Sequence, residues 1–143
     1  MKIETTIEKL NALRKNSTDI KVIFHAEKFV RVLKEIPNFN LENEDIATIE
    51  NELSTMFIKD EIDHKTIRIK LSYFLDFLNR NFSIVKPKQN IIYLALIGSI
   101  IGLFWGFLFL IIGLFIGSLI GYLLDLDALN NNRTLKTNFD IYK

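Results

Sequence analysis

The chain has 143 residues, of which 49% are hydrophobic, and its formal net charge is +1. It contains no cysteine, which excludes disulfides, thiolate metal sites and cysteine nucleophiles. An uncharged apolar run at residues 91–124 leaves ninety residues before it, enough for one small domain, and a short tail after it.

The amino-terminal residues predict a first helix over residues 3–15. The start of the chain is charged at Lys2 and Glu4 and lacks the apolar stretch of a cleavable signal peptide, so we expect this domain to stay in the cytoplasm. Polar residues at 16–19 end the first helix and cap the next one. The apolar face of the first helix consists of Ile3, Ile7, Leu10 and Leu13.

Two further helices are predicted before residue 60. The second spans residues 19–36 and ends at Pro37, since proline cannot continue a helix. The third runs to about Lys59, and acidic residues at its start suit the positive end of a helix dipole. The apolar stripe of the second helix includes Val22, Ala26, Phe29, Leu33 and Ile36.

The segment from Ile67 to Phe82 fits two patterns. Residues 67–71 alternate like a strand, whereas the apolar residues of the whole segment recur at helical spacing. We predict a helix, because no partner strand exists elsewhere in the chain and one strand alone leaves its backbone unpaired. The expected domain is therefore a bundle of about four helices over residues 1–82.

Charge changes sign twice before the apolar run. Residues 1–36 carry eight basic and five acidic side chains, residues 37–63 carry one and eight, and residues 64–90 carry six and one. One interpretation is an acidic third helix between basic neighbours, and the other is a docking face for a basic partner or for anionic lipid. In the basic linker at 83–90 and just before it, Arg80, Lys86 and Lys88 are expected to lie at the membrane interface and to set orientation.

Residues 91–124 are expected to lie in a bilayer. The run has thirty-four residues and no charge, which exceeds what a soluble core helix needs. One straight helix of this length would reach about 51 Å, well beyond about 30 Å of hydrocarbon, whereas two full spans need about forty residues. Length alone therefore leaves a single span and a hairpin open.

Glycine and aromatic positions favour the hairpin. Two GxxxGxxxG zippers are mirrored about the Phe109–Leu110 bond. Antiparallel arms would therefore bring the glycine at 98 level with that at 121, the one at 102 level with that at 117, and the one at 106 level with that at 113. Trp105 would lie at the tip, with Tyr93 and Tyr122 together at the open end, as two interfacial belts. The predicted helix-packing residues are Gly98, Gly102, Gly106, Gly113, Gly117 and Gly121.

Catalytic and metal-binding patterns are sparse. Glu61 and His64 form one Glu-x-x-His, but a dimetal bundle needs two such motifs and two more glutamates. The other histidine, His25, is interpreted as a residue at the edge of the bundle. We expect a protein that is not an enzyme, with no catalytic residue, no metal and no cofactor.

The end of the run resembles a known kind of protein. The segment from Gly113 to Ala128 closes on Leu-Asp-x-x-Ala before a polar tail, and Phe77 to Lys86 provides a similar lead-in. Over residues 77–135 the chain is similar to small bacterial glycine-zipper membrane proteins, although leucine and asparagine stand where that family has lysines after the aspartate. The resemblance implies an inner-membrane protein that faces the cytoplasm, and it implies no activity.

The predicted architecture is all-α: a cytoplasmic bundle at 1–82, a linker at 83–90, a transmembrane glycine-zipper hairpin at 91–124 and a polar cytoplasmic tail at 125–143. Two functions remain open. The chain could be a membrane-anchored adaptor or accessory subunit of a larger membrane complex, or it could self-assemble into a pore or membrane-disrupting effector. The absence of a polar stripe in the run favours the adaptor. Expected partners are membrane lipid and further protein subunits, including copies of the chain itself, with no nucleic acid.

Overall fold

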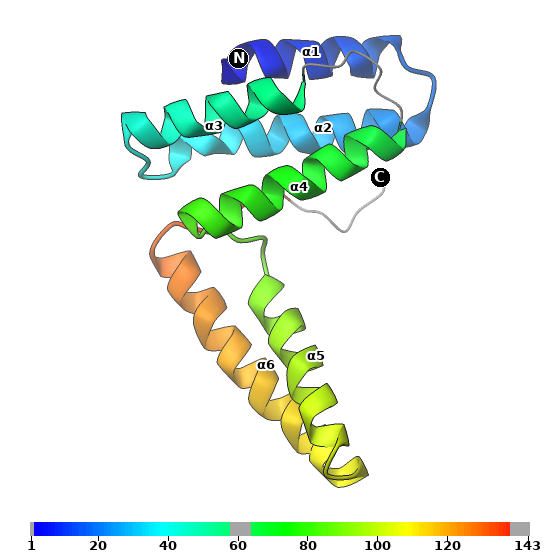
Figure 1. Ribbon diagram of the computed structural model, residues 1–143, viewed down its shortest axis with the longest axis vertical. Helices are drawn as coiled ribbons and strands as arrows, with labels where there is room; N and C mark the ends of the chain where they lie inside the picture. The colour runs from blue at the N-terminus through cyan, green and yellow to red at the C-terminus, as the bar shows by residue number, and fades with distance from the viewer. Residues whose placement is uncertain (1, 58–63, 138–143) are drawn as a thin grey trace. The chain divides into compact units, whose positions relative to one another are not determined.

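The computed structural model describes residues 2–57 and 64–137 (Figure 1). Within these ranges the chain is all-helical, which confirms the predicted fold class at that level. The helices are α1 Ile3–Asn16, α2 Ile20–Glu35, the short 3-10 helix η1 Ile36–Asn38, α3 Asn43–Met56, α4 His64–Phe82, α5 Gln89–Leu103 and α6 Phe107–Asn130.

The chain forms two compact units. The first holds the residues up to Phe77 together with Thr137, and the second holds Leu78 to Lys136. The division falls inside α4, a few residues before the boundary at 82 that the sequence predicted. In the first unit, the Thr137 hydroxyl hydrogen-bonds to the Glu35 carboxylate and so ties the chain's later part to α2.

Helix starts in the first unit follow the polar residues that the sequence places there. The Asp19 carboxylate accepts a 2.8 Å hydrogen bond from the Lys21 N–H, which confirms the expected cap of α2. At α3, Glu42 and Asp45 form a reciprocal capping box, in which the Glu42 N–H donates to Asp45 at 3.0 Å. Pro37 lies in η1, directly after α2, as its missing N–H requires.

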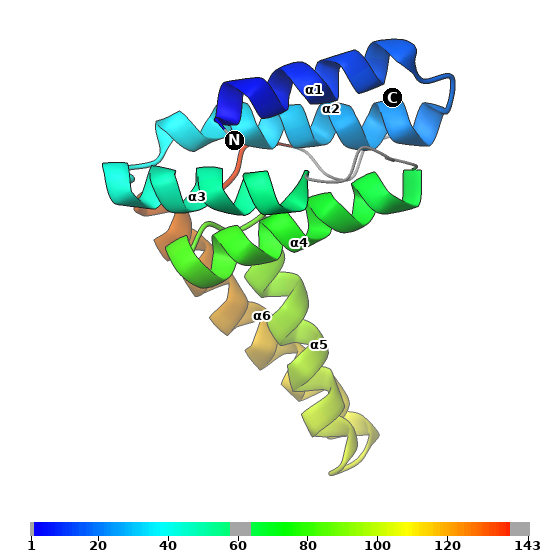
Figure 2. The ribbon, with the colours of Figure 1, turned by 45° about the horizontal axis from the view of Figure 1, so that its top comes forward.

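Phe29 of α2 is the centre of the first unit's core. Its side chain is fully buried, and its ring lies 5.7 Å from that of Phe57, which follows α3, and 5.3 Å from that of Phe74 in α4. These centroid distances are those of favourable aromatic pairs. Helix α1 lies along α2, as Figure 2 shows, and the Ile3 N–H donates to the Glu50 carboxylate of α3.

Residues 67–82 are helical, so the choice of helix over strand is confirmed. Ile67 and Phe74 are fully buried, whereas the intervening Ile69 is 57% exposed, as expected for one apolar helix face. The described part of α3 ends at Met56, and its predicted end near Lys59 lies outside the described residues.

The second unit consists mainly of α5 and α6, which lie side by side and antiparallel (Figure 1). Residues 104–106 connect them. Helix α5 begins at Gln89, two residues before the uncharged run, and α6 continues to Asn130, six residues past its end. The expected linker and tail therefore contribute residues to both helices.

Candidate functional site

The pair α5 and α6 exposes most of its apolar side chains. Within the described ranges, α6 is the one helix that is long and apolar enough to cross a membrane, and α5 is a shorter apolar helix. Only 11% of the most apolar part of α6 is buried. Large exposed apolar side chains occur on both helices and include Ile92, Leu96, Ile101, Leu108, Phe115, Leu119 and Leu123.

Glycines bring the two helix backbones into direct contact. A Cβ atom added to Gly98 would overlap the carbonyl of Gly113, and one added to Gly113 would overlap that of Gly98, both well inside 3.0 Å. Gly117 meets Leu94 in the same way, and Gly121 meets Asn90. Because the neighbouring atoms are backbone, no side chain can turn aside to admit a methyl group.

The predicted pairing of glycines across the two arms is wrong. The sequence placed Gly98 beside Gly121 and Gly102 beside Gly117, but Gly98 lies against Gly113, and Gly102 lies against Phe109 and Leu110. The pairing is antiparallel, as expected, but its mirror point lies four residues earlier in the chain. The expected pairing of Gly106 with Gly113 is absent as well, since no described atom beyond the two chain neighbours of Gly106 lies within 4 Å of a Cβ built on it.

The position of the turn explains this difference. Gly106 has φ +118° and ψ 167°, a conformation that residues with a Cβ rarely adopt. It precedes α6 directly, and its carbonyl accepts hydrogen bonds from the N–H groups of Phe109 and Leu110. Gly106 therefore forms the turn, and the arms meet about that residue and Trp105 instead of about Phe109.

The open end of the pair is closed by Asp125. Its two carboxylate oxygens accept hydrogen bonds from the N–H groups of Asn90 and Ile91, each 3.1 Å long. Lys88 precedes α5 in a left-handed conformation and provides no side-chain cap. A carboxylate of α6 thus caps the positive end of α5 across the pair.

A short backbone bridge lies beside this cap. The Val85 N–H donates to the Arg133 carbonyl, and the Leu135 N–H donates to the Val85 carbonyl, both at 2.9 Å. Arg133 also pairs with the Asp127 carboxylate. The residues entering α5 and leaving α6 are therefore joined to each other, which holds the open end of the pair together.

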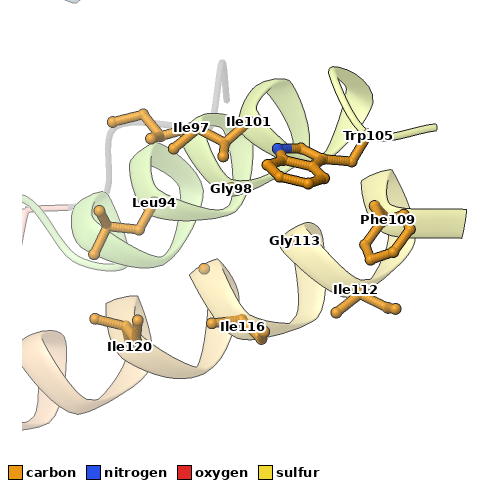
Figure 3. Close-up of a pocket in the computed structure, with 12 residues that line it drawn as sticks. Leu94, Ile97, Gly98, Ile101, Trp105, Phe109, Ile112, Gly113, Ile116 and Ile120 are labelled. Carbon is orange, nitrogen blue, oxygen red and sulfur yellow. The ribbon is translucent and has the colours of Figure 1, made fainter. Parts of the chain in front are cut away.

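One side of the helix contact is a groove of about 500 Å³ (Figure 3). Four glycines form its floor, and apolar side chains from both helices form its walls. Trp105 and Phe109 lie together at one end, with their ring centroids 6.5 Å apart. The wall residues include Leu94, Ile97, Ile101, Ile112, Ile116 and Ile120.

The aromatic residues that were predicted to lie at the interfaces are exposed. Trp105 is in the turn and is 76% exposed. Tyr93 and Tyr122 are also exposed, but they do not lie at one level: Gly121 meets Asn90 and Gly117 meets Leu94, so Tyr122 lies about one helical turn nearer the open end.

The basic residues predicted for the interface occupy different settings. Arg80 is exposed near the end of α4, and Lys88 is exposed just before α5. Lys86, in the segment that connects these two helices, is half-buried. Ser99 donates to the Ala95 carbonyl within α5, so this hydroxyl is satisfied inside its own helix.

The candidate metal-binding residues do not come together in the part of the chain that the structure describes. Groups of three or more His, Asp or Glu side chains placed to hold a metal are absent from the described residues. Glu61 of the Glu-x-x-His lies outside them. His25 packs its ring edge-on against Phe24 at a centroid distance of 5.4 Å. In α4, burial lowers the pKa of Lys70, whose amine lies 4.7 Å from the ring centroid of Phe57.

Comparisons with protein-family models, with curated proteins and with solved structures find no match to this chain. The sequence predicted an apolar, glycine-bearing pair. The sequence analysis missed the capping role of Asp125. Two features could have indicated it: no capping side chain precedes α5, and Asp125 is the first charged residue after the apolar run.

Proposed function

We propose that this chain is a non-enzymatic integral membrane protein in which α5 and α6 form a transmembrane glycine-zipper hairpin. Helices α1 to α4 form a small bundle held at the cytoplasmic face of a bacterial inner membrane, where they act as an adaptor or accessory subunit of a larger membrane assembly. The observation that carries the proposal is the exposed apolar surface of α5 and α6.

That surface is costly in water. Soluble monomers rarely expose a contiguous apolar patch of more than a few hundred Å². A core helix of a soluble protein is as apolar as α6 but is mostly buried, whereas 11% of the apolar part of α6 is buried. Hydrocarbon is the solvent that matches this surface, and both helices satisfy their interior backbone groups within themselves, as a bilayer requires.

The glycine contacts support a hairpin packed within one copy. Lipid provides no hydrophobic drive for helix association, so close backbone packing has to provide it. Gly98, Gly113 and Gly117 are already in contact with the opposite arm. A ring of several copies would need an outward glycine face, and these contacts therefore favour the adaptor over the pore.

The charges support one orientation. Lys88 precedes α5, Arg133 follows α6, and residues 91–124 between them carry no charge, including the turn. Basic residues next to membrane helices favour the cytoplasmic side. Both ends of the hairpin would then face the cytoplasm.

Membrane association and copy number together test this function. We expect the full chain, expressed in bacteria, to stay with the membrane after an alkaline wash, and its detergent-extracted form to be a single copy or part of a complex with other proteins. Leu119→Lys places a charge on the exposed face of α6 and should release the chain from the membrane. A wild-type chain in the soluble fraction would refute the proposal, and a homo-oligomeric ring that conducts ions would establish the pore instead.

A further inference from the structure

The helix pair is shorter than the hydrocarbon layer that it is proposed to cross, and the inference that follows rests on the proposed membrane location. Uncharged residues of α6 run from Phe107 to Leu124, which gives a length of about 27 Å. Those of α5 run from Ile91 to Leu103, or about 20 Å. A typical hydrocarbon core is about 30 Å thick, so the uncharged part of α6 falls about 3 Å short of it and that of α5 about 10 Å short.

The open end cannot move inward to share this shortfall. Asp125 is held at the start of α5 by its bonds to Asn90 and Ile91, and Asp127 pairs with Arg133 just beyond it. These charged groups need water or headgroups around them. The open end is thereby fixed at the near interface. In a bilayer of typical thickness, the turn would therefore end inside the hydrocarbon, short of the far interface.

The turn carries backbone groups that hydrocarbon cannot satisfy. Among the described residues, the N–H groups of Phe107 and Leu108 find no backbone acceptor, as is usual at the start of a helix. In hydrocarbon each such unpaired group costs far more than one ångström of mismatch between a helix and a bilayer. A turn that reaches the far headgroups through a thinner bilayer is therefore favoured over a turn left in the hydrocarbon.

We propose that the bilayer thins locally around α5 and α6, so that the turn at residues 104–106 reaches the headgroup boundary of the far leaflet. The turn is suited to this boundary. Phe104 is 86% exposed and Trp105 is 76% exposed, and aromatic side chains with a polar edge, such as tryptophan, favour the interface. The turn therefore fits the surface of a phospholipid bilayer, preferably one with short acyl chains.

Trp105 itself reports the depth of the turn, because it is the only tryptophan in the chain. The full chain is reconstituted in phosphatidylcholine vesicles with short, medium or long monounsaturated acyl chains, and lipids brominated at different depths quench its fluorescence. We expect quenching in medium chains to be strongest for bromines near the headgroup. In long chains, where thinning costs most, we expect it to shift toward deeper bromines, with emission at shorter wavelength.

Lipid competition measures the thinning directly. The chain is reconstituted in a mixture of short-chain and long-chain lipids, of which one is brominated. From the quenching of Trp105 fluorescence, we expect a several-fold preference for short-chain lipids around this residue. Strongest quenching by bromines at the acyl chain ends in medium-chain vesicles, or no preference for short chains, would overturn the proposal. Absence of quenching by any lipid would instead refute the membrane location itself.

Two lysine variants provide an independent test. Phe104→Lys places a charge in the turn, and Phe115→Lys places one on a similarly exposed site, 68% exposed, in the middle of α6. If the turn lies at the far interface, Phe104→Lys should keep full vesicle binding while Phe115→Lys loses it. Equal loss in both variants would place the turn in hydrocarbon and overturn the thinning. Full binding of both would mean that the pair is not inserted at all.

Discussion

Replacing Asp125 with alanine should open the end of the helix pair without unfolding the first unit. The substitution removes both carboxylate oxygens that accept from Asn90 and Ile91 at 3.1 Å. Since Lys88 provides no cap, two N–H groups at the start of α5 then lose their acceptors. Asp125 lies in the second unit, and the core around Phe29 lies in the first.

The magnitude follows from the two bonds. Loss of a helix cap costs about 0.5–2 kcal/mol, and hydrogen bonds to a charged group contribute about 1.5–3 kcal/mol each. Because Asp125 is half-exposed, we discount the two bonds to the upper end of the range for a helix cap, about 2 kcal/mol for both bonds together. A change of this size raises the population of the open state roughly thirty-fold.

Amide hydrogen exchange of the full chain in detergent micelles measures that opening. We expect the amides of Asn90 and Ile91 to exchange roughly thirty-fold faster in Asp125→Ala, and by a smaller factor in Asp125→Asn, which keeps one acceptor oxygen. Asp127→Ala is the matched control, because the Asp127 carboxylate bonds to Arg133 and Asn131 and, among the described residues, accepts no hydrogen bond from α5. Unchanged exchange in Asp125→Ala, or an equal rise in Asp127→Ala, would refute the capping role.

Three other predictions test other parts of the molecule. Gly98→Leu should separate the arms and lower the melting temperature in detergent at unchanged copy number, and a stepwise drop in size-exclusion mass would show packing between copies instead. Residues 1–82 alone should give a helical circular dichroism spectrum with a cooperative melt, and a random-coil spectrum would contradict the helical bundle. Burial lowers the pKa of Lys70 below 10.5, so the unfolded chain binds more protons and stability should rise with pH up to about that value. Lys70→Met should remove this slope in thermal melts, and an unchanged slope would assign it to another group.

Local periodicity was enough to predict the helices of the first unit. Pro37 ends α2 and Asp19 caps it, because each acts on backbone groups within a few residues of itself. The choice between strand and helix at 67–82 also followed from local reasoning, since one strand alone leaves its backbone unpaired.

The register of the helix pair could not be derived in the same way. Six glycines at four-residue spacing allow more than one antiparallel alignment, and the symmetric alignment about Phe109 used them all. The structure uses five in helices and one, Gly106, in the turn, where its φ of +118° decides the alignment. Spacing alone does not show which glycine serves backbone conformation and which serves close packing.

The role of Asp125 depends on that register. With the mirror point at the Phe109–Leu110 bond, Asp125 would have lain level with Leu94, more than one helical turn inside α5 and away from its first N–H groups. With the turn at Gly106, Gly121 meets Asn90, and the carboxylate one turn further along α6 reaches the first N–H groups of α5. A contact between residues thirty-five apart follows from the alignment of the whole pair, which local sequence does not determine.

Thiol labelling from each side of the membrane tests the central claim most directly. The chain has no cysteine, so Lys88→Cys and Arg133→Cys each introduce a single reporter just outside one arm of the pair. A membrane-impermeant maleimide is applied to intact bacterial cells and to inside-out membrane vesicles. A membrane hairpin with both ends in the cytoplasm predicts labelling of both variants in the vesicles and of neither in intact cells. Labelling of the two variants from opposite sides would contradict the hairpin and establish a single crossing.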